Sequence, residues 1–108
     1  MPTVERRFYK LVSSNSSEVD DYILANGDTL EISDVGGNAG LSEDSVIQII
    51  WNPGGADEEI ILATHGDASQ EIFSKSFAGD GTKKLRIKLT NDKSVSDYIG
   101  GYWIGATR

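Results

Sequence analysis

Apolar and polar residues follow each other along this chain in short, regularly interrupted runs. Segments of about 5–10 residues rich in Ile, Val, Leu and aromatic residues are separated by clusters of Gly, Asn, Asp and Ser. The alternation is clearest over Lys83–Asn91, where Leu85, Ile87 and Leu89 alternate with polar and basic residues. A period of two places the aliphatic side chains on one face of a strand and the basic ones on the other. No run shows the period of about 3.6 residues typical of a helix, so the pattern predicts an all-β protein.

Several of the other predicted strands depart from simple alternation. Val46–Trp51 is apolar on both faces, which indicates a central strand or an outer face covered by a partner. The spacing in Glu71–Ala78 breaks alternation and favours a bulge. Gly100 and Gly101 interrupt the last run, which indicates a bulge, a bend or a close approach of backbones. The remaining predicted strands are Arg6–Val12, Thr29–Ser33, Ile60–Thr64 and Val95–Thr107.

Turn-forming residues connect these strands. The order of Pro and Gly in Asn52–Gly55 suits a type II turn and predicts a hairpin between Val46–Trp51 and Glu59–Thr64. Gly79–Thr82 predicts a second hairpin between its flanking strands, and Asn91–Ser94 leads into the last one. We expect one domain over residues 1–108, a jelly-roll-like sandwich of two antiparallel sheets with about seven or eight strands.

Composition narrows the classes of function. The 108 residues include no cysteine, which excludes thiol chemistry, disulfides and the antibody type of sandwich. A formal net charge of -7 disfavours non-specific binding to nucleic acid or anionic lipid. The first ten residues carry charges without an apolar segment, and no apolar run is long enough to cross a bilayer. We therefore expect no signal peptide, no membrane insertion, no nucleic-acid partner, and a location in the cytoplasm or in a virion.

Charge is distributed unevenly along the chain. Residues 1–81 contain 4 Lys/Arg and 15 Asp/Glu, whereas residues 82–108 contain 6 Lys/Arg and 2 Asp/Glu. Two readings follow: two faces of one domain that attract each other, or a polarised surface that docks head-to-tail or against an acidic partner.

Few residues offer catalytic or metal-binding chemistry. His65 precedes Gly-Asp in a turn, and no G-x-S-x-G signature accompanies it. Adjacent acidic residues are typical of solvated loops in a domain this small, which has little room for a glycosidase cleft. We predict no catalytic residue, no metal and no cofactor, and leave open whether Asp34–Asn38, or Asp92 with Asp97, binds calcium.

Aromatic residues are the remaining candidates for a binding site. Trp51 ends an aliphatic strand and is predicted to lie in the core. Tyr102 and Trp103 are adjacent, so a regular strand points them to opposite faces. One hypothesis is a carbohydrate-binding module in which Trp103, Tyr102 and Tyr98 stack on sugar rings. Outward apolar side chains instead favour an oligomer interface, for which the predicted residues are Val46, Gln48 and Ile50.

Four segments together resemble the small β-sandwich decoration and fibre-type proteins of tailed-phage virions. These segments are Ala25–Ile32, Ile49–Gly55, Phe77–Leu89 and Gly100–Ala106. The resemblance implies a small, glycine-rich, all-β, non-enzymatic protein that forms homo-oligomers, commonly trimers, on a capsid or tail. The first hypothesis is accordingly a structural or interaction protein that self-assembles or joins a virion, and the alternative is a carbohydrate-binding module.

Overall fold

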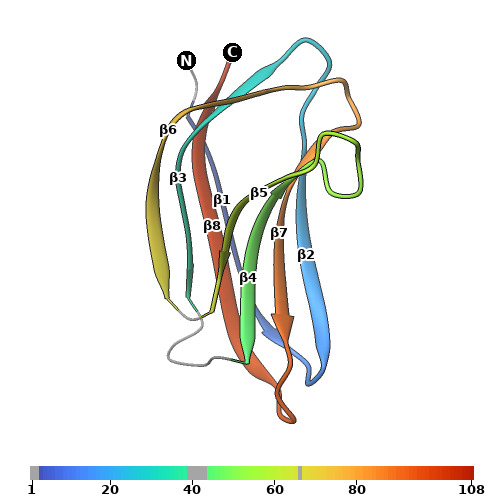
Figure 1. Ribbon diagram of the computed structural model, residues 1–108, viewed down its shortest axis with the longest axis vertical. Coiled ribbons are helices and arrows are strands. Elements are labelled where there is room, and N and C mark those ends of the chain that lie inside the picture. The colour runs from blue at the N-terminus through green and yellow to red at the C-terminus, as the bar shows by residue number, and fades with distance from the viewer. Residues whose placement is uncertain (1–2, 39–43, 66) are drawn as a thin grey trace.

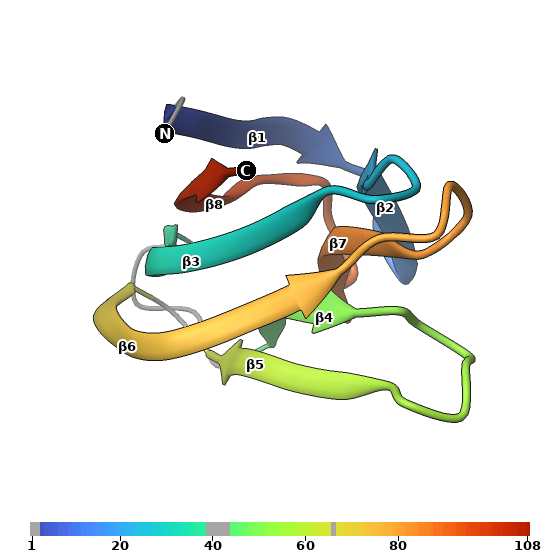
Figure 2. The same cartoon turned by 90° about the horizontal axis from the view of Figure 1, so that it is seen from above.

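The computed structural model contains two four-stranded antiparallel sheets that face each other (Figures 1 and 2). It describes residues 3–38, 44–65 and 67–108, without the side chains of residues 68 and 71–74. We call β1-β8-β3-β6 sheet A and β2-β7-β4-β5 sheet B. The strands are β1 (Thr3–Val12), β2 (Ser16–Ile23), β3 (Thr29–Asn38), β4 (Ser45–Trp51), β5 (Glu59–Thr64), β6 (Ala68–Ala78), β7 (Lys84–Asn91) and β8 (Asp97–Thr107).

The strand order is that of a jelly roll. Every connection between consecutive strands passes from one sheet to the other, except that between β4 and β5. The predicted all-β, jelly-roll-like sandwich is confirmed. No helix in the described residues is long and apolar enough to cross a membrane.

Inward-facing side chains of both sheets form one core. The alternation predicted in β7 is observed, because Leu85, Ile87 and Leu89 are fully buried between the sheets. Trp51 is buried as predicted and stacks on Phe77 of β6, with ring centroids 4.7 Å apart. Such packing of aliphatic and aromatic side chains removes apolar surface from water and is the main stabilising contribution to the fold.

The two predicted hairpins have different outcomes. The β4–β5 hairpin is confirmed: Gly55 N donates to Asn52 O at 3.0 Å, and Gly54 has a φ of 81°, as a type II turn requires. The predicted hairpin around Gly79–Thr82 is wrong, because β6 lies in sheet A and β7 in sheet B. Gly81 N donates to Leu24 O at 3.0 Å, which helps hold this connection as a crossing between the sheets.

Two irregularities predicted from the sequence are present. Ile32 pairs with Lys75, and Asp34 pairs with Glu71, so β3 advances by two residues where β6 advances by four. The extra residues of β6 form the bulge expected in Glu71–Ala78. Gly101 lies on the inner side of sheet A, where a Cβ would come within 2.8 Å of Ile87 Cγ2. The paired glycines therefore allow the close approach of backbone and opposing side chains that the sequence indicated.

Candidate functional site

The outer side of sheet A carries the largest exposed aromatic group of the described residues. We call this surface, made of Arg7, Tyr9, Leu11, Tyr98 and Tyr102, the tyrosine face. The side chains of Tyr9 and Tyr98 are 64% and 55% exposed, and their rings stack with centroids 5.5 Å apart and planes at 10°. Leu11, also exposed, is directly opposite Tyr98 in the register of β1 and β8. The exposed apolar groups therefore form one contiguous patch.

Glycines give the tyrosine rings their positions. Gly36 and Gly100 both face outward, and a Cβ on Gly36 would overlap the ring of Tyr102. A Cβ on Gly100 would come within 2.7 Å of Tyr9 Cδ2. An aromatic ring that covers a glycine on the neighbouring strand stabilises a sheet at a position with no side chain of its own. The Tyr-Gly-Tyr alternation in β8 thus holds the rings close to the sheet.

A groove of about 660 Å³ lies beside these rings. The groove is open because Gly37, Gly100 and Gly101 line it and have no side chains to fill it. A volume of this size is within the range of known ligand-binding sites, roughly 300–1,000 Å³. Its lining residues come from all four strands of sheet A and the segment before β6: Arg7, Phe8, Tyr9, Gly37, Asn38, Asp67, Ser69, Gly100, Gly101 and Tyr102.

Arg7 is held in place at one side of the groove. Its guanidinium carbon lies 5.0 Å from the ring centroid of Tyr102, a cation–π distance, and its Nε donates to Glu5 Oε1 at 2.9 Å. The groove thus combines tyrosine rings with a guanidinium, a carboxylate, an amide and a hydroxyl. This mixture suits an uncharged polar ligand or a protein surface.

The outer side of sheet B carries mostly positive charge. We call it the cationic face: Lys84, Arg86 and Lys88 of β7 point outward beside a single carboxylate, Asp21 of β2. Arg86 donates to Asp21 through Nε at 2.7 Å and Nη2 at 3.0 Å, and Lys84 Nζ lies 3.5 Å from the same carboxylate. The hydrogen bonds from Arg86 lower the pKa of Asp21 and raise that of Arg86.

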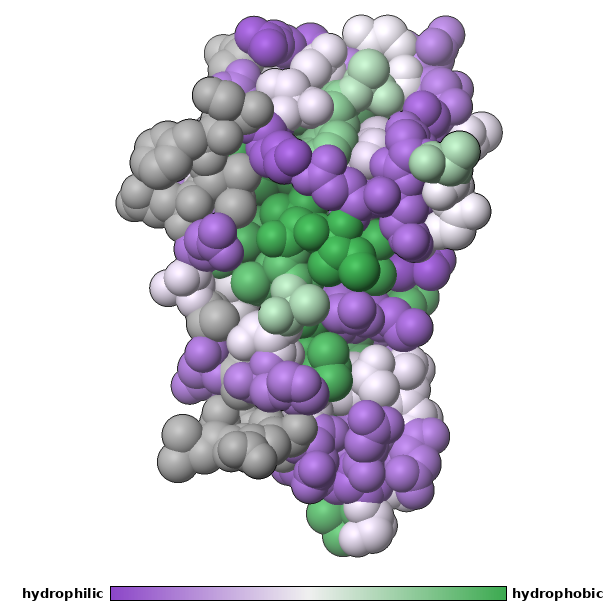
Figure 3. Space-filling view, in the orientation of Figure 1, coloured by the Kyte–Doolittle hydropathy of each residue, from purple (hydrophilic) through white to green (hydrophobic). Residues whose placement is uncertain are grey.

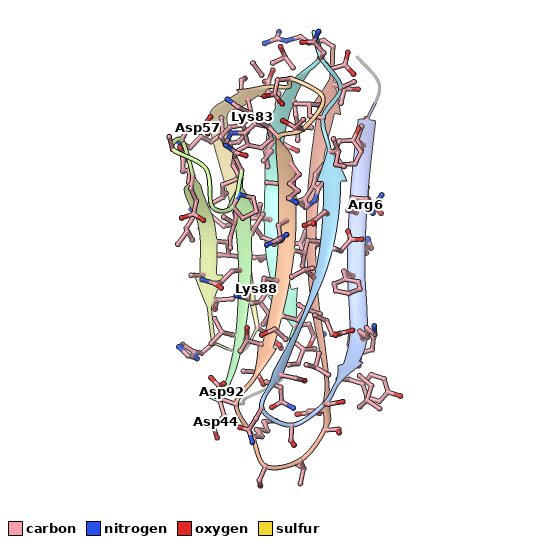
Figure 4. The ribbon with its side chains drawn as sticks, turned by 90° about the vertical axis from the view of Figure 1, so that its right-hand side faces the viewer. Arg6, Asp44, Asp57, Lys83, Lys88 and Asp92 are labelled. Atoms are coloured by element: carbon pink, nitrogen blue, oxygen red, sulfur yellow. The ribbon has the colours of Figure 1, made fainter. Side chains whose placement is uncertain are left out.

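Lys88 lies near mid-height of the sandwich (Figure 4), after Lys84 and Arg86 along β7. In the register of sheet B it stands between Val19 of β2 and Gln48 of β4. Within the described residues Lys88 has no carboxylate partner. It is therefore a cation free to pair with a group from outside the chain.

The predicted ligand-binding residues are only partly placed at this surface. Tyr98 and Tyr102 lie on the tyrosine face, whereas Trp103 is fully buried between the sheets. Its prediction as a ligand-binding residue is wrong: the alternation of β8 turns its indole inward, where its ring centroid lies 5.2 Å from that of Tyr22. Trp103 Nε1 has no hydrogen-bond partner in the described part of the chain.

The predicted interface residues lie on the outer side of sheet B. Val46 and Gln48 are half-buried there, and Ile50 is only 7% exposed because neighbouring side chains cover it. An apolar area is visible at mid-height over β4 and β5 (Figure 3). Ile60 of the edge strand β5, opposite Ile50 in the register, is exposed. β4 lies between β7 and β5 and is a central strand, as its doubly apolar pattern indicated.

Tyr9, Leu11 and Gly36 belong to the site but do not stand out in the sequence. The alternation over Arg6–Val12 gives their strand, yet only its pairing with β8 shows that Tyr9 meets Tyr98. That pairing joins residues about ninety positions apart in the chain and has no local signal. The Tyr-x-Gly-x-Tyr spacing of β8 was the only available hint.

The described residues offer no metal centre. They contain no group of three or more His, Asp or Glu side chains able to hold an ion. Of the two calcium candidates, Asp34–Asn38 lies within β3. In the other, Asp92 with Asp97, Asp97 forms an ion pair with Lys93, which lowers the pKa of its carboxyl. Asp92 N donates to the backbone oxygen of Asp44 at 2.8 Å. His65 is exposed at the end of β5.

Comparison with known proteins gives similarity in fold only. No protein-family model matches the chain, and no curated protein matches its sequence. A periplasmic inhibitor of g-type lysozyme from Aeromonas hydrophila is similar in structure, with a TM-score of 0.48 and 13% identity over 96% of this chain and 86% of that one. The Drosophila NLP core, studied for pentamer formation and histone binding, gives a TM-score of 0.44 and 12% identity over 91% and 96% of the two chains. At such identities a similar fold says nothing of a similar ligand.

Proposed function

We propose that the protein is a non-enzymatic interaction module that self-assembles, with its tyrosine face docked on the surface of another copy of the chain. The observation that carries this is the contiguous exposed patch of Tyr9, Leu11 and Tyr98. Monomeric proteins seldom leave such a patch in water, and tyrosine is enriched where protein surfaces meet. The resemblance to phage decoration and fibre-type proteins supports a virion as the larger assembly.

Sedimentation equilibrium over a range of concentrations tests this function. We expect the weight-average mass of the wild type to rise above that of the 11.7 kDa chain as concentration increases. Tyr98→Ser should reduce the association constant at least about tenfold, since it removes one ring of the stacked pair. Val95→Ser is the matched control, because Val95 is similarly exposed but lies in the loop before β8. A wild type that stays monomeric at millimolar concentration contradicts the proposal.

Carbohydrate binding is the second candidate for the same face. It is favoured by the nearly parallel rings of Tyr9 and Tyr98 beside a groove that contains Asn38, Asp67 and Ser69. Aromatic faces stack on the apolar side of a sugar ring while amide, carboxylate and hydroxyl groups bind its hydroxyls. Glycan-array binding that is lost in Tyr9→Ala and kept in Val95→Ser would establish it. A silent array with a self-associating protein would favour the first function.

A further inference from the structure

The two outer faces of the sandwich complement each other in charge. On the cationic face Lys84 and Arg86 share the carboxylate of Asp21 and Lys88 has no carboxylate partner among the described residues, whereas on the outer side of sheet A the acidic residues outnumber the basic ones. We propose that copies of this chain stack head-to-tail, with the tyrosine face of one copy on the cationic face of the next and Lys88 paired with Asp34. This inference rests on the proposed self-assembly and names the surface that the tyrosine face meets.

The acidic side of this contact comes from β3 and the groove. Two outward carboxylates of sheet A are already compensated: Glu5 by Arg7, and Glu31 by Arg108 at 3.6 Å. Asp34, half-buried on the same side, has no cationic partner in the described part of the chain. Asp34 lies two residues from Gly36, over which the ring of Tyr102 rests. A cation brought to Asp34 thus also meets the edge of the tyrosine patch.

The cationic side offers both charge and apolar contact. Lys88 is flanked by Val19 and Gln48, and Ile23 is exposed at the end of β2 on the same side. Tyr9, Leu11 and Tyr98 would cover the aliphatic side chains of Val19 and Ile23, while Lys88 supplies the cationic partner that Asp34 lacks. A second copy brings both sets of groups together, which a uniformly acidic partner does not.

The position of the two faces determines the kind of assembly. They lie on opposite sides of the sandwich (Figure 2), so a contact between unlike faces leaves one free face at each end of a pair. Such a heterologous contact continues from copy to copy and forms an open stack or a ring, whereas a contact between like faces stops at a dimer.

Sedimentation velocity with charge-reversal variants tests the contact. The wild-type mass should continue to rise past that of a dimer with concentration, and should fall as salt screens the faces. Lys88→Glu and Asp34→Lys should each reduce the association constant at least about tenfold, because each brings like charges together. A one-to-one mixture of the two variants, and the double variant D34K/K88E, should regain association, since every contact again pairs opposite charges. Lys93→Glu and Asp28→Lys, matched in charge change but outside both faces, should associate like the wild type.

Three results would overturn the inference and leave self-assembly standing. They are a wild type that stops at a dimer, single reversals that associate normally, and a mixture that does not regain association. A loss of association in Ile60→Lys alone would place the contact at the edge strand β5 instead. A wild type that is monomeric at every concentration would overturn both the stack and the proposed function. Circular dichroism of each variant shows whether a loss of association reflects a loss of folding.

Discussion

Gly100 and Gly101 are adjacent in β8 but serve different purposes. Gly101 faces the core, where a Cβ would come within 2.8 Å of Ile87 Cγ2 and 3.0 Å of Ile47 Cγ2. Gly100 lies on the outer side of sheet A, where the ring of Tyr9 covers it. The alternation of a strand thus gives one glycine a packing role and its neighbour a role in shaping the tyrosine face.

Substitution of these glycines should separate the two roles. We expect Gly101→Ala to lower the free energy of unfolding by about 1–3 kcal/mol, because the packed core cannot move away from the added methyl group. Gly100→Ala should cost less, since the Tyr9 ring can swing into solvent, but should weaken association or ligand binding. Urea denaturation measures the first effect and sedimentation the second. Equal loss of stability in both variants would contradict this division.

The carboxylate of Asp80 stabilises the connection between β6 and β7. It accepts hydrogen bonds from the backbone N–H groups of Lys83 and Thr82 and from the Thr82 hydroxyl, each at 2.8 Å. These bonds favour the charged form and lower the pKa of Asp80 from 3.8 to about 2. The Asx-type geometry holds the chain where it crosses from sheet A to sheet B.

The lowered pKa predicts how stability depends on pH. A carboxyl with a lower pKa in the folded state stabilises the fold fully above its unfolded value and loses this contribution as pH falls through the folded value. Asp80 should therefore contribute its full stabilisation above pH 3.8 and lose it on acidification toward pH 2. Asp80→Asn should be less stable than the wild type at pH 7, and the difference should shrink over that interval. Urea denaturation at each pH measures it, and a difference that stays constant down to pH 2 would contradict this role.

At the scale of elements, ion pairs close the open side of the sandwich between β1 and β2. Arg6 donates to Asp20 through Nε at 3.1 Å and Nη2 at 2.8 Å, and Lys10, four residues further along β1, pairs with Glu18. The bond to Asp20 raises the pKa of Arg6. Charges on edge strands also discourage pairing with other chains. These charges therefore protect the edges at β1 and β2 from pairing with another chain.

A double-mutant cycle tests the strength of this closure. We expect a coupling free energy of about 1 kcal/mol between Arg6→Ala and Asp20→Ala, because the pair is bidentate and partly shielded from water. The pair Arg7–Glu5 is the matched control: its side chains are 59% and 47% exposed, against 40% and 22% for Arg6 and Asp20. Its coupling should be near zero. A coupling at Arg6–Asp20 no larger than the control would contradict the closing role.

The elements themselves were largely predictable, and their partners were not. Period-two alternation in β7 and the Pro-Gly turn after β4 are local signals, and both gave correct structure. Whether Gly79–Thr82 folds a strand back in its own sheet or passes to the other sheet depends on contacts with Leu24, far away in the sequence. The alternation of Tyr102 and Trp103 showed that one is outward and one buried, but not which, because the same pattern fits both registers.

At the scale of the whole molecule, the first strand pairs with the last. Thr3 is opposite Ala106 in the register of β1 and β8, so the beginning of β1 and the end of β8 lie side by side (Figure 1). Sheet A therefore depends on a contact that spans nearly the whole sequence. Proteins dominated by such non-local pairing fold slowly, because the entropy of loop closure must be lost before the contacts form.

A circular permutant tests this dependence. We expect a chain with its ends joined by a short Gly/Ser linker, and opened between Ser14 and Asn15, to fold faster than the wild type. In this chain β8 is followed directly by β1, so their pairing becomes a local hairpin and the largest loop closure disappears. The equilibrium free energy of unfolding should change by less than about 1 kcal/mol, since Thr3, Arg108 and Asn15 in the opened turn are exposed. Stopped-flow refolding measures the rate; an unchanged rate with unchanged stability would show that β1 joins β8 only after the rate-limiting step.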